Sequence, residues 1–269
     1  MSSHHGRLVF LVGALVVASI GVFGLQGSRA SGGPGSCSTN ATCTRVLFIV
    51  DSLTYVNDLP VTFAELAWAG GHRVYTRALA SSGETLAGHV ADPSTAPTIM
   101  SEHWNAVVLQ DQSENPALAY YLRSETDPAA TQLVATIRKD GAEPLLFVTW
   151  AHQAGWPQAD LPDYATMQAA IDQGYLGLAG NLGVPIAPVG ETWQTVVSSQ
   201  TNADLWQSDG VHPTLAGTYL AACVFYATIF HQSPVGLSYR DNLSHSEATG
   251  LQQAAASTVL SDPATRGLS

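Results

Sequence analysis

Two short segments, far apart in the chain, carry the residue types that nucleophilic catalysis requires. Ser52 stands two residues after the apolar run 46–50, with Asp51 between them, and Asp209 and His212 stand three residues apart in a polar segment. An activated serine needs a base within hydrogen-bond reach and a third group that fixes the tautomer of that base. The spacing of Asp209 and His212 lets the carboxylate turn back to one imidazole nitrogen while the other nitrogen faces outward. These three residues would form a hydrolytic triad if the fold brings Ser52 to His212.

Each of these residues also has a simpler interpretation. A serine that follows a strand often caps the next helix. The Asp-x-x-His spacing is common by chance, and a loop with Asp-Gly and His-Pro has structural reasons of its own. Asp51 as the nucleophile, as in haloacid-dehalogenase-type phosphatases, is disfavoured because position 53 is leucine where those enzymes place a second aspartate. The usual α/β-hydrolase nucleophile elbow is disfavoured because no Gly-x-Ser-x-Gly stretch occurs.

The elements that must position these residues alternate between strand and helix. Residues 46–50 are continuously apolar and rich in β-branched side chains, which is typical of a strand buried on both faces. The further predicted strands are 74–75, 106–109, 144–148 and the proline-containing edge strand 184–189, and the predicted helices include 60–70, 127–141 and 163–183. Because parallel strands need crossover connections, the sequence predicts a three-layer α/β/α sandwich with a doubly wound, flavodoxin-like parallel sheet of about five strands.

Polar residues mark the expected helix starts. Asp127 and Asp163 are predicted N-caps, and Ser244 with Glu247 predicts a capping box. Pro213 is expected at the first position of an apolar helix that runs to residue 230, which makes His212 its N-cap or the neighbour of the cap. The imidazole of His212 would then be presented at the loop and not packed inside.

Further residues converge on the same edge of the predicted sheet, because the carboxyl ends of parallel strands meet there. Gly83 follows the second strand and Gln112 follows the third. With these positions the chain resembles the SGNH (GDSL-type) hydrolase superfamily of serine esterases, over roughly residues 45–230. The matching segments are Asp51-Ser52-Leu53, Gly83, Gln110-Asp111-Gln112 and Asp209-Gly210-Val211-His212-Pro213.

The resemblance implies a metal-independent and cofactor-free esterase. Ser52 would be the nucleophile, His212 the base and then the acid, and Asp209 the group that orients His212. The oxyanion hole would consist of the backbone N–H groups of Ser52 and Gly83 and the side-chain amide of Gln112, with Gln110 as the alternative donor. The family usually has asparagine where Gln112 stands and glycine where Val50 stands. The extra methylene of glutamine would displace the amide by about 1.5 Å, enough to matter for catalysis.

Charge and aromatic content bear on the substrate. A net charge of −11 disfavours nucleic acid as a partner. The expected substrate is a small-molecule or glycan ester, with acylated carbohydrate before a short-chain lipid or aryl ester. Four tryptophans on or near predicted loops would either stack on sugar rings or pack in the core and rim: Trp150, Trp156, Trp193 and Trp206. His152 is expected to be an ordinary surface histidine of its loop.

Three segments make up the chain. Residues 1–30 contain the apolar run 8–25 and predict either a cleaved signal peptide or a retained N-terminal anchor, which would be the only contact with a membrane. Residues 31–44 predict a linker with a candidate Cys37–Cys43 disulfide, in keeping with an exported, extracytoplasmic protein. Residues 45–269 form the expected catalytic domain. Cys223 is expected to be a buried thiol.

Two other functions share this predicted fold. An exported carbohydrate-binding module would keep the fold without turnover. An acyltransferase would use the same acyl-enzyme and pass the acyl group to an alcohol in place of water. The sequence does not separate these from an esterase, although the triad residues favour an enzyme.

Overall fold

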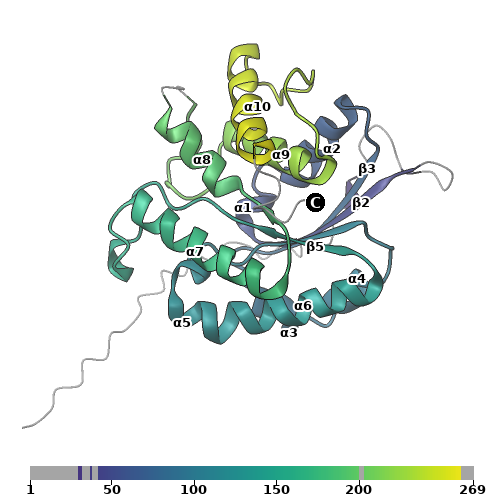
Figure 1. The fold of residues 1–269 in the computed structure, drawn as a ribbon, viewed down its shortest axis with the longest axis vertical. Coiled ribbons are helices and arrows are strands. Elements are labelled where there is room, and N and C mark those ends of the chain that lie inside the picture. The colour runs from purple at the N-terminus through teal and green to yellow at the C-terminus, as the bar shows by residue number, and fades with distance from the viewer. Residues whose placement is uncertain (1–29, 32–36, 38–41, 200–202, 262–269) are drawn as a thin grey trace, which may run out of the picture.

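A computed structural model describes residues 30–31, 37, 42–199 and 203–261, and Figure 1 shows its ribbon. The sheet has the strand order β1-β3-β2-β4-β5-β6. Its strands are β1 (Ala30–Ser31), β2 (Thr44–Val50), β3 (Val74–Ala80), β4 (Ala106–Leu109), β5 (Glu143–Phe147) and β6 (Ile186–Ala187). Strands β2 to β6 are parallel, and β1 pairs antiparallel with β3 at one edge. The five parallel strands have the flavodoxin-like order, so the predicted fold class is confirmed.

Helices connect the parallel strands. The α-helices are α1 (Ser52–Tyr55), α2 (Leu59–Ala69), α3 (Leu86–Ala91), α4 (Thr95–Ile99), α5 (Ala119–Tyr121), α6 (Asp127–Asp140), α7 (Tyr164–Leu182), α8 (Val189–Ser198), α9 (Leu215–Phe230) and α10 (His245–Leu260). Short 3₁₀ turns are η1 (Asn115–Ala117) and η3 (Pro157–Ala159), and η2 (Leu122–Thr126) is a π-helical turn that leads into α6.

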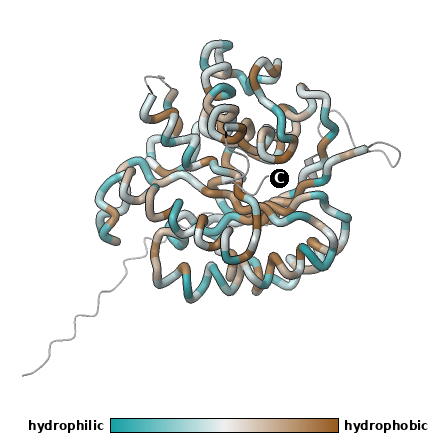
Figure 2. Tube along the Cα trace, viewed as in Figure 1, coloured by the Kyte–Doolittle hydropathy of each residue, from teal (hydrophilic) through white to brown (hydrophobic). Residues whose placement is uncertain are grey.

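The helices form the two outer layers of the sandwich. In Figure 1, α2, α8, α9 and α10 lie above the sheet, and α3 to α7 lie below it. The upper core takes Phe48 and Val108 from the strands, and the lower core takes Leu47 and Ile49. Successive residues of a strand point to opposite faces, so β2 must be apolar at every position that both layers cover. Figure 2 shows the hydrophobic residues concentrated in the strands and in α9.

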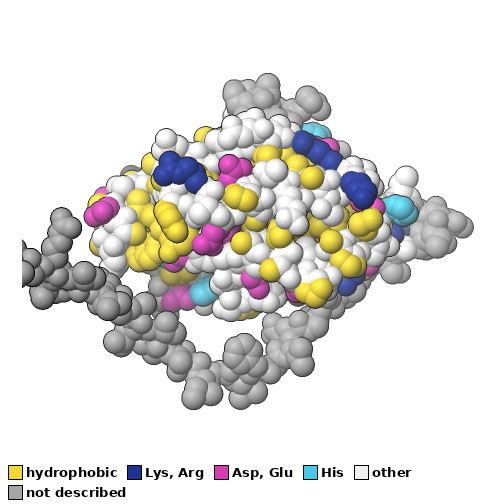
Figure 3. All heavy atoms as spheres, turned by 90° about the horizontal axis from the view of Figure 1, so that it is seen from below, with side chains coloured by type: hydrophobic (Ala, Val, Ile, Leu, Met, Phe, Trp, Pro, Cys, Tyr) yellow, Lys and Arg dark blue, Asp and Glu magenta, His cyan; other side chains and the backbone are white. Residues whose placement is uncertain are grey.

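The outer surface of the lower layer differs from this core. Figure 3 views that face, where Lys and Arg side chains appear only in small separate groups among neutral and acidic ones. Tyr120 is the most exposed large apolar side chain of the described residues.

Two of the predicted helix starts are confirmed and two are wrong. Asp163 caps α7 and Ser244 caps α10, each accepting a backbone N–H three residues later. Asp127 does not cap α6, because the chain is already helical through η2 and the helix continues from it without a break. The cap of α9 is Thr214 and not His212, since the Thr214 hydroxyl accepts the N–H of Gly217.

A disulfide joins Cys37 and Cys43, and Cys223 is a fully buried thiol. Of the described helices, none is both long and apolar enough to cross a membrane. The predicted signal or anchor at residues 8–25 and most of the predicted linker lie outside the described residues.

Candidate active site

Ser52 lies where β2 gives way to α1. Asp51 is the N-cap of α1, and its Oδ1 accepts the N–H of Leu53 at 2.9 Å. Helix capping is therefore done by Asp51, which leaves the Ser52 hydroxyl for another partner. Ser52 is only 7% exposed, and its Oγ lies 3.0 Å from Nε2 of His212.

The other nitrogen of His212 contacts Asp209. Nδ1 of His212 lies 2.7 Å from Oδ2 of Asp209, while Oδ1 accepts the backbone N–H groups of Val211 and His212 at 2.9 and 3.0 Å. Gly210 takes a positive φ of 70°, which glycine adopts without strain and which closes the turn between the two residues. The structure thus brings Ser52, His212 and Asp209 into one hydrogen-bonded chain.

Hydrogen bonds between two loops hold His212 in place. Two hydrogen bonds join the loop after β5 to the 206–213 loop. The indole N–H of Trp150 donates to the carbonyl of Val211 at 2.9 Å, and the indole N–H of Trp206 donates to the carbonyl of Ala151 at 3.1 Å. The N–H of Gln153 also donates to the carbonyl of Gly210 at 2.8 Å. The position of the imidazole therefore depends on the end of β5.

The tryptophans that make these contacts are not a sugar platform. Trp150 and Trp193 stack with their ring centroids 4.1 Å apart, and Trp206 packs edge-on against Trp193. All three side chains are buried. The interpretation that they stack on sugar rings is therefore wrong, and they pack in the core. Trp156 is half-buried and packs against the lower core.

The two carboxylates beside the nucleophile have opposite pKa shifts. Burial raises the pKa of Asp51 to about 7, although hydrogen bonds from Gln110 and Leu53 oppose the rise. Burial also acts to raise the pKa of Asp209, but hydrogen bonds from Val211 and His212 outweigh it and hold the pKa below its ordinary value. Asp209 is thus an anion suited to stabilise an imidazolium at His212.

Gln110 is committed to the protein interior. Its Oε1 accepts the N–H of Asp51 and the hydroxyl of Thr54, both at 3.1 Å, and its Nε2 donates to the carbonyl of Asp111 at 2.6 Å. Gln110 is fully buried. The Oε1 end holds the end of β4 against the turn that carries the nucleophile, and the Nε2 end is bonded within its own segment, so both ends of the Gln110 amide are occupied.

Gly83 and Gln112 lie after the two strands that flank β2. Gly83 has a φ of 63° in the turn after β3, and Gln112 accepts the N–H of Glu114 through Oε1 at 3.1 Å. Nearby, the buried carboxylate of Asp111 accepts the N–H of Leu86 and the hydroxyl of Thr126, which fastens the two loops together. Within the described part of the chain, neither Gly83 nor Gln112 hydrogen-bonds to a residue of the Ser52–His212–Asp209 chain.

A second polar cluster lies beside these residues. Nε2 of His152 lies 3.1 Å from Oγ of Ser113 and 3.5 Å from Oε1 of Glu114. The side chain of His152 is only 14% exposed, so the expectation of a surface histidine is wrong. Burial lowers the pKa of His152, although the charges of Glu114 and Asp209 oppose that shift, and the charge of His212 adds to it. Spacing alone did not reveal this cluster, because its members come together only where β4 and β5 pair.

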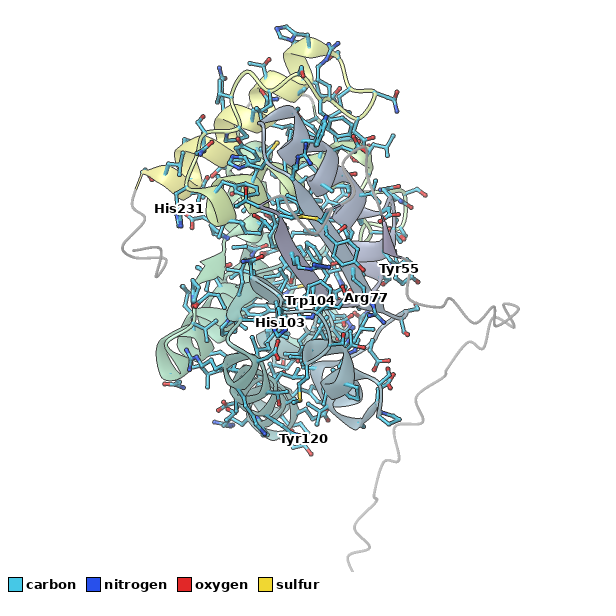
Figure 4. All side chains as sticks on the ribbon, turned by 90° about the vertical axis from the view of Figure 1, so that its right-hand side faces the viewer. Tyr55, Arg77, His103, Trp104, Tyr120 and His231 are labelled. Atoms are coloured by element: carbon cyan, nitrogen blue, oxygen red, sulfur yellow. A yellow bond between two sulfur atoms is a disulfide. The ribbon has the colours of Figure 1, made fainter. Side chains whose placement is uncertain are left out.

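The remaining features lie away from Ser52. A cavity of about 470 Å³ opens at the edge where the strands begin, lined by residues that include Thr44, Glu143 and His231. Figure 4 looks onto that edge, with His231 after α9 and His103 ahead of β4. Among the described residues, no group of three or more His, Cys, Asp and Glu side chains is arranged to hold a metal ion.

Comparisons with known proteins connect this geometry to a superfamily. No protein-family model matches the sequence, and no curated protein matches it. Among solved structures, a DUF4886 family protein from Bacteroides uniformis superposes with a TM-score of 0.71 at 19% identity, covering 81% of this chain and 95% of its own. A protein from Slackia heliotrinireducens described as an SGNH hydrolase gives a TM-score of 0.59 at 26% identity, covering 70% of this chain and 99% of its own. An acetyl-xylooligosaccharide esterase from Geobacillus gives 0.52 at 16%, covering 68% and 92%.

These neighbours confirm the resemblance to the SGNH hydrolase superfamily. Several are hydrolases and esterases, which supports a hydrolase of that fold. Most of them are under 25% identical to this chain and show only the fold, so the chemistry depends on the residues that this chain places at the site.

Proposed function

We propose that this protein is a serine esterase that hydrolyses carboxylic esters through an acyl-enzyme. The observation that carries the proposal is the unbroken chain from Ser52 Oγ to His212 Nε2 at 3.0 Å and from His212 Nδ1 to Asp209 Oδ2 at 2.7 Å. Each heavy-atom distance allows direct proton transfer or a charge-assisted hydrogen bond. The roles follow from which nitrogen of His212 meets which partner.

In the acylation step, Ser52 Oγ attacks the ester carbonyl carbon while His212 Nε2 takes the hydroxyl proton. Asp209 accepts from Nδ1 and stabilises the imidazolium that forms. The tetrahedral intermediate collapses as the ester C–O bond breaks, and Nε2 returns the proton to the departing alcohol oxygen. Water then repeats the sequence on the acyl-enzyme and releases the carboxylic acid. An alcohol in place of water would give acyl transfer by the same residues.

The oxyanion of each tetrahedral intermediate needs donors that are already in position. We assign this role to the N–H of Ser52, the N–H of Gly83 and the side-chain amide of Gln112. Gln112 is favoured over Gln110 for this role, because the amide of Gln110 is already hydrogen-bonded within the protein. The bond from the Glu114 N–H holds Oε1 of Gln112, and this orients Nε2 away from that backbone.

We also propose that the protein is exported. The Cys37–Cys43 disulfide supports this, because disulfides persist in oxidising compartments. The apolar run 8–25 would be the export signal or a retained anchor. An intact-mass measurement of protein recovered outside the cytoplasm distinguishes the two, since cleavage near residue 30 removes the whole run.

The esterase proposal is tested by hydrolysis of p-nitrophenyl acetate. Ser52→Ala should lower the rate to the residual acceleration of about 10³- to 10⁴-fold over water that binding and the oxyanion hole supply. Ser257→Ala, in the last turns of α10, is the matched control, because among the described residues its hydroxyl is hydrogen-bonded to the carbonyl of Ala254 alone. Wild-type turnover in Ser52→Ala would end the proposal.

A further inference from the structure

The order of the strands fixes the order of polar groups along the carboxyl edge of the sheet. Gly83 follows β3, Ser52 follows β2, Ser113 and Glu114 follow β4, and His152 follows β5. Gly83 and the Ser113–Glu114 segment therefore lie on opposite sides of Ser52. The proposed oxyanion hole lies among the N–H groups of Ser52 and Gly83 and the amide of Gln112, so a part of the substrate that extends beyond Gln112 comes to the ends of β4 and β5.

The group near β4 and β5 is built like a triad but cannot relay a proton as one. Ser113 Oγ and Glu114 Oε1 both approach the same nitrogen, Nε2 of His152. In a relay, the carboxylate must hold the nitrogen that the serine does not use. We call this group the His152 cluster. It contains the side chains of a catalytic triad, but their arrangement suits hydrogen bonding to a ligand and not proton transfer to a nucleophile.

The proton positions in the His152 cluster follow from its partners. An ionised Glu114 only accepts hydrogen bonds, so Nε2 of His152 carries the proton that both neighbours share. Ser113 Oγ then acts as an acceptor, and its own hydrogen remains for a third partner. Across residues 42–199 and 203–261, no other group is hydrogen-bonded to the Ser113 hydroxyl. The cluster thus offers one hydroxyl donor and one carboxylate acceptor to a molecule in the site.

The His152 cluster lies on the side from which His212 works. The chain next to His152 is bonded to the triad loop through Gln153 and Gly210, and His152 is close enough to Asp209 and His212 for their charges to act on it. Nε2 of His212 delivers its proton to the departing alcohol oxygen. The groups that flank His212 therefore face the alcohol part of an ester, and not its acyl part.

We propose that Ser113, Glu114 and His152 form a subsite that binds hydroxyl groups on the alcohol part of the substrate, so that the esters of polyols or sugars are preferred over those of simple alkanols. This proposal rests on the esterase function and adds the substrate class. Carboxylate acceptors and hydroxyl donors match vicinal hydroxyls, which present both a donor and an acceptor. An alkyl group at the same place would leave Glu114 desolvated without a partner.

The test compares two esters with the same acetyl group and the same three-carbon alcohol, glycerol 1-acetate and propyl acetate. The wild type should have the higher kcat/KM for glycerol 1-acetate. In Glu114→Gln the ratio of the two kcat/KM values should fall by about tenfold to a hundredfold, the loss expected for a hydrogen bond to a charged group. Ser113→Ala should lower the ratio by about tenfold. Glu143→Gln, at the opposite end of β5, is the matched control with an exposed carboxylate.

A second measurement separates binding from a purely structural role. Glycerol should inhibit p-nitrophenyl acetate hydrolysis competitively, and its inhibition constant should rise about tenfold in Glu114→Gln. A ratio within twofold of the wild type in both variants would overturn the proposal, as would an equal loss on both esters. Failure of the esterase function would look different, because the wild type would then hydrolyse neither ester, and both proposals would fall together.

Discussion

Two groups of serine, histidine and carboxylate lie at the same edge of this sheet, and they differ in how the histidine is used. His212 contacts Ser52 through one nitrogen and Asp209 through the other. His152 contacts both Ser113 and Glu114 through a single nitrogen. The first arrangement can pass a proton along its length, whereas the second can only hold hydrogen-bond partners in place. Both groups contain a hydroxyl, an imidazole and a carboxylate, so the chemistry depends on which ring nitrogen faces which neighbour.

The two histidines also differ in their surroundings. The half-exposed side chain of Asp209 keeps contact with water, and backbone N–H groups hold its charge. Glu114 and His152 are more enclosed, and burial lowers the pKa of His152. A neutral His152 suits a binding role at neutral pH, while Asp209 stays ionised to support a charged His212.

The largest expected difference is between the two histidines. His212→Asn should lower kcat for p-nitrophenyl acetate by about 10⁴- to 10⁶-fold, because the general base is lost. His152→Asn should lower it by no more than about tenfold, the effect of one hydrogen bond. Single-turnover kinetics of the two variants measure this contrast directly.

A double variant makes the contrast more stringent. Ser52→Ala combined with His212→Asn should be no slower than the worse single variant, since residues that act as one unit are not additive. Multiplicative losses would mean that Ser52 and His212 act separately, and would break the comparison in favour of two independent sites.

The next largest difference is between the two carboxylates. Asp209→Asn should reduce kcat by up to about 10⁴-fold, because asparagine supports the wrong tautomer of the imidazole. Glu114→Gln should reduce kcat for p-nitrophenyl acetate far less, since this ester has no hydroxyl for Glu114 to bind. Steady-state kinetics with this single substrate check both. Equal losses would place Glu114 in the proton relay.

The smallest expected effect concerns stability, and it compares how Asp51 and Asp209 make the free energy of unfolding depend on pH. The pKa of Asp51 is raised from 3.8 to about 7, so between these values the native state holds a proton that the unfolded chain has released. Stability from this group is therefore present at low pH and lost as pH rises toward 7. Asp209 has the opposite sign, because its lowered pKa gives stability that is lost as pH falls.

The Asp51 contribution is measurable by urea unfolding at several pH values. Asp51→Asn keeps the oxygen that caps α1 but does not titrate. As pH rises from 4 to 8, the wild type should lose stability that the variant keeps. The free energy of unfolding of Asp51→Asn should therefore rise relative to that of the wild type, by at most about 4 kcal/mol. A difference between the two proteins that does not change with pH would show that Asp51 is not held protonated by burial.

Much of the fold was predictable because it depends on local sequence. The apolar run 46–50 could only be a strand covered on both faces, and the alternation of elements left a doubly wound sheet as the natural arrangement. The Asp209–His212 contact was also predictable from the sequence, because a turn of three residues brings the carboxylate back to the imidazole. Helix starts were predicted correctly at Asp163 and Ser244, where the chain ahead of the cap is not helical. The start at Asp127 was predicted wrongly, because a π turn already leads into that helix and no cap is needed.

The rest of the site needed the order of the strands in space. Ser113 and His152 are 39 residues apart and meet only because β4 pairs with β5. Trp150 and Trp193 follow the ends of β5 and β6, but whether such a side chain turns outward or into the core depends on the helices that cover it. Gln110 and Gln112 differ by two positions, and only the hydrogen bonds show that Gln110 is bound to the nucleophile turn.

The most direct test of the central claim is to label the folded protein with a fluorophosphonate probe and locate the adduct by peptide mass spectrometry. Among the described residues, Ser52 and Ser113 are the serines that hydrogen-bond to a histidine, so the position of the adduct distinguishes the two groups. The proposed relay predicts one adduct, on Ser52, that disappears in His212→Asn and persists in His152→Asn. An adduct on Ser113, or no adduct on a folded protein, would contradict it.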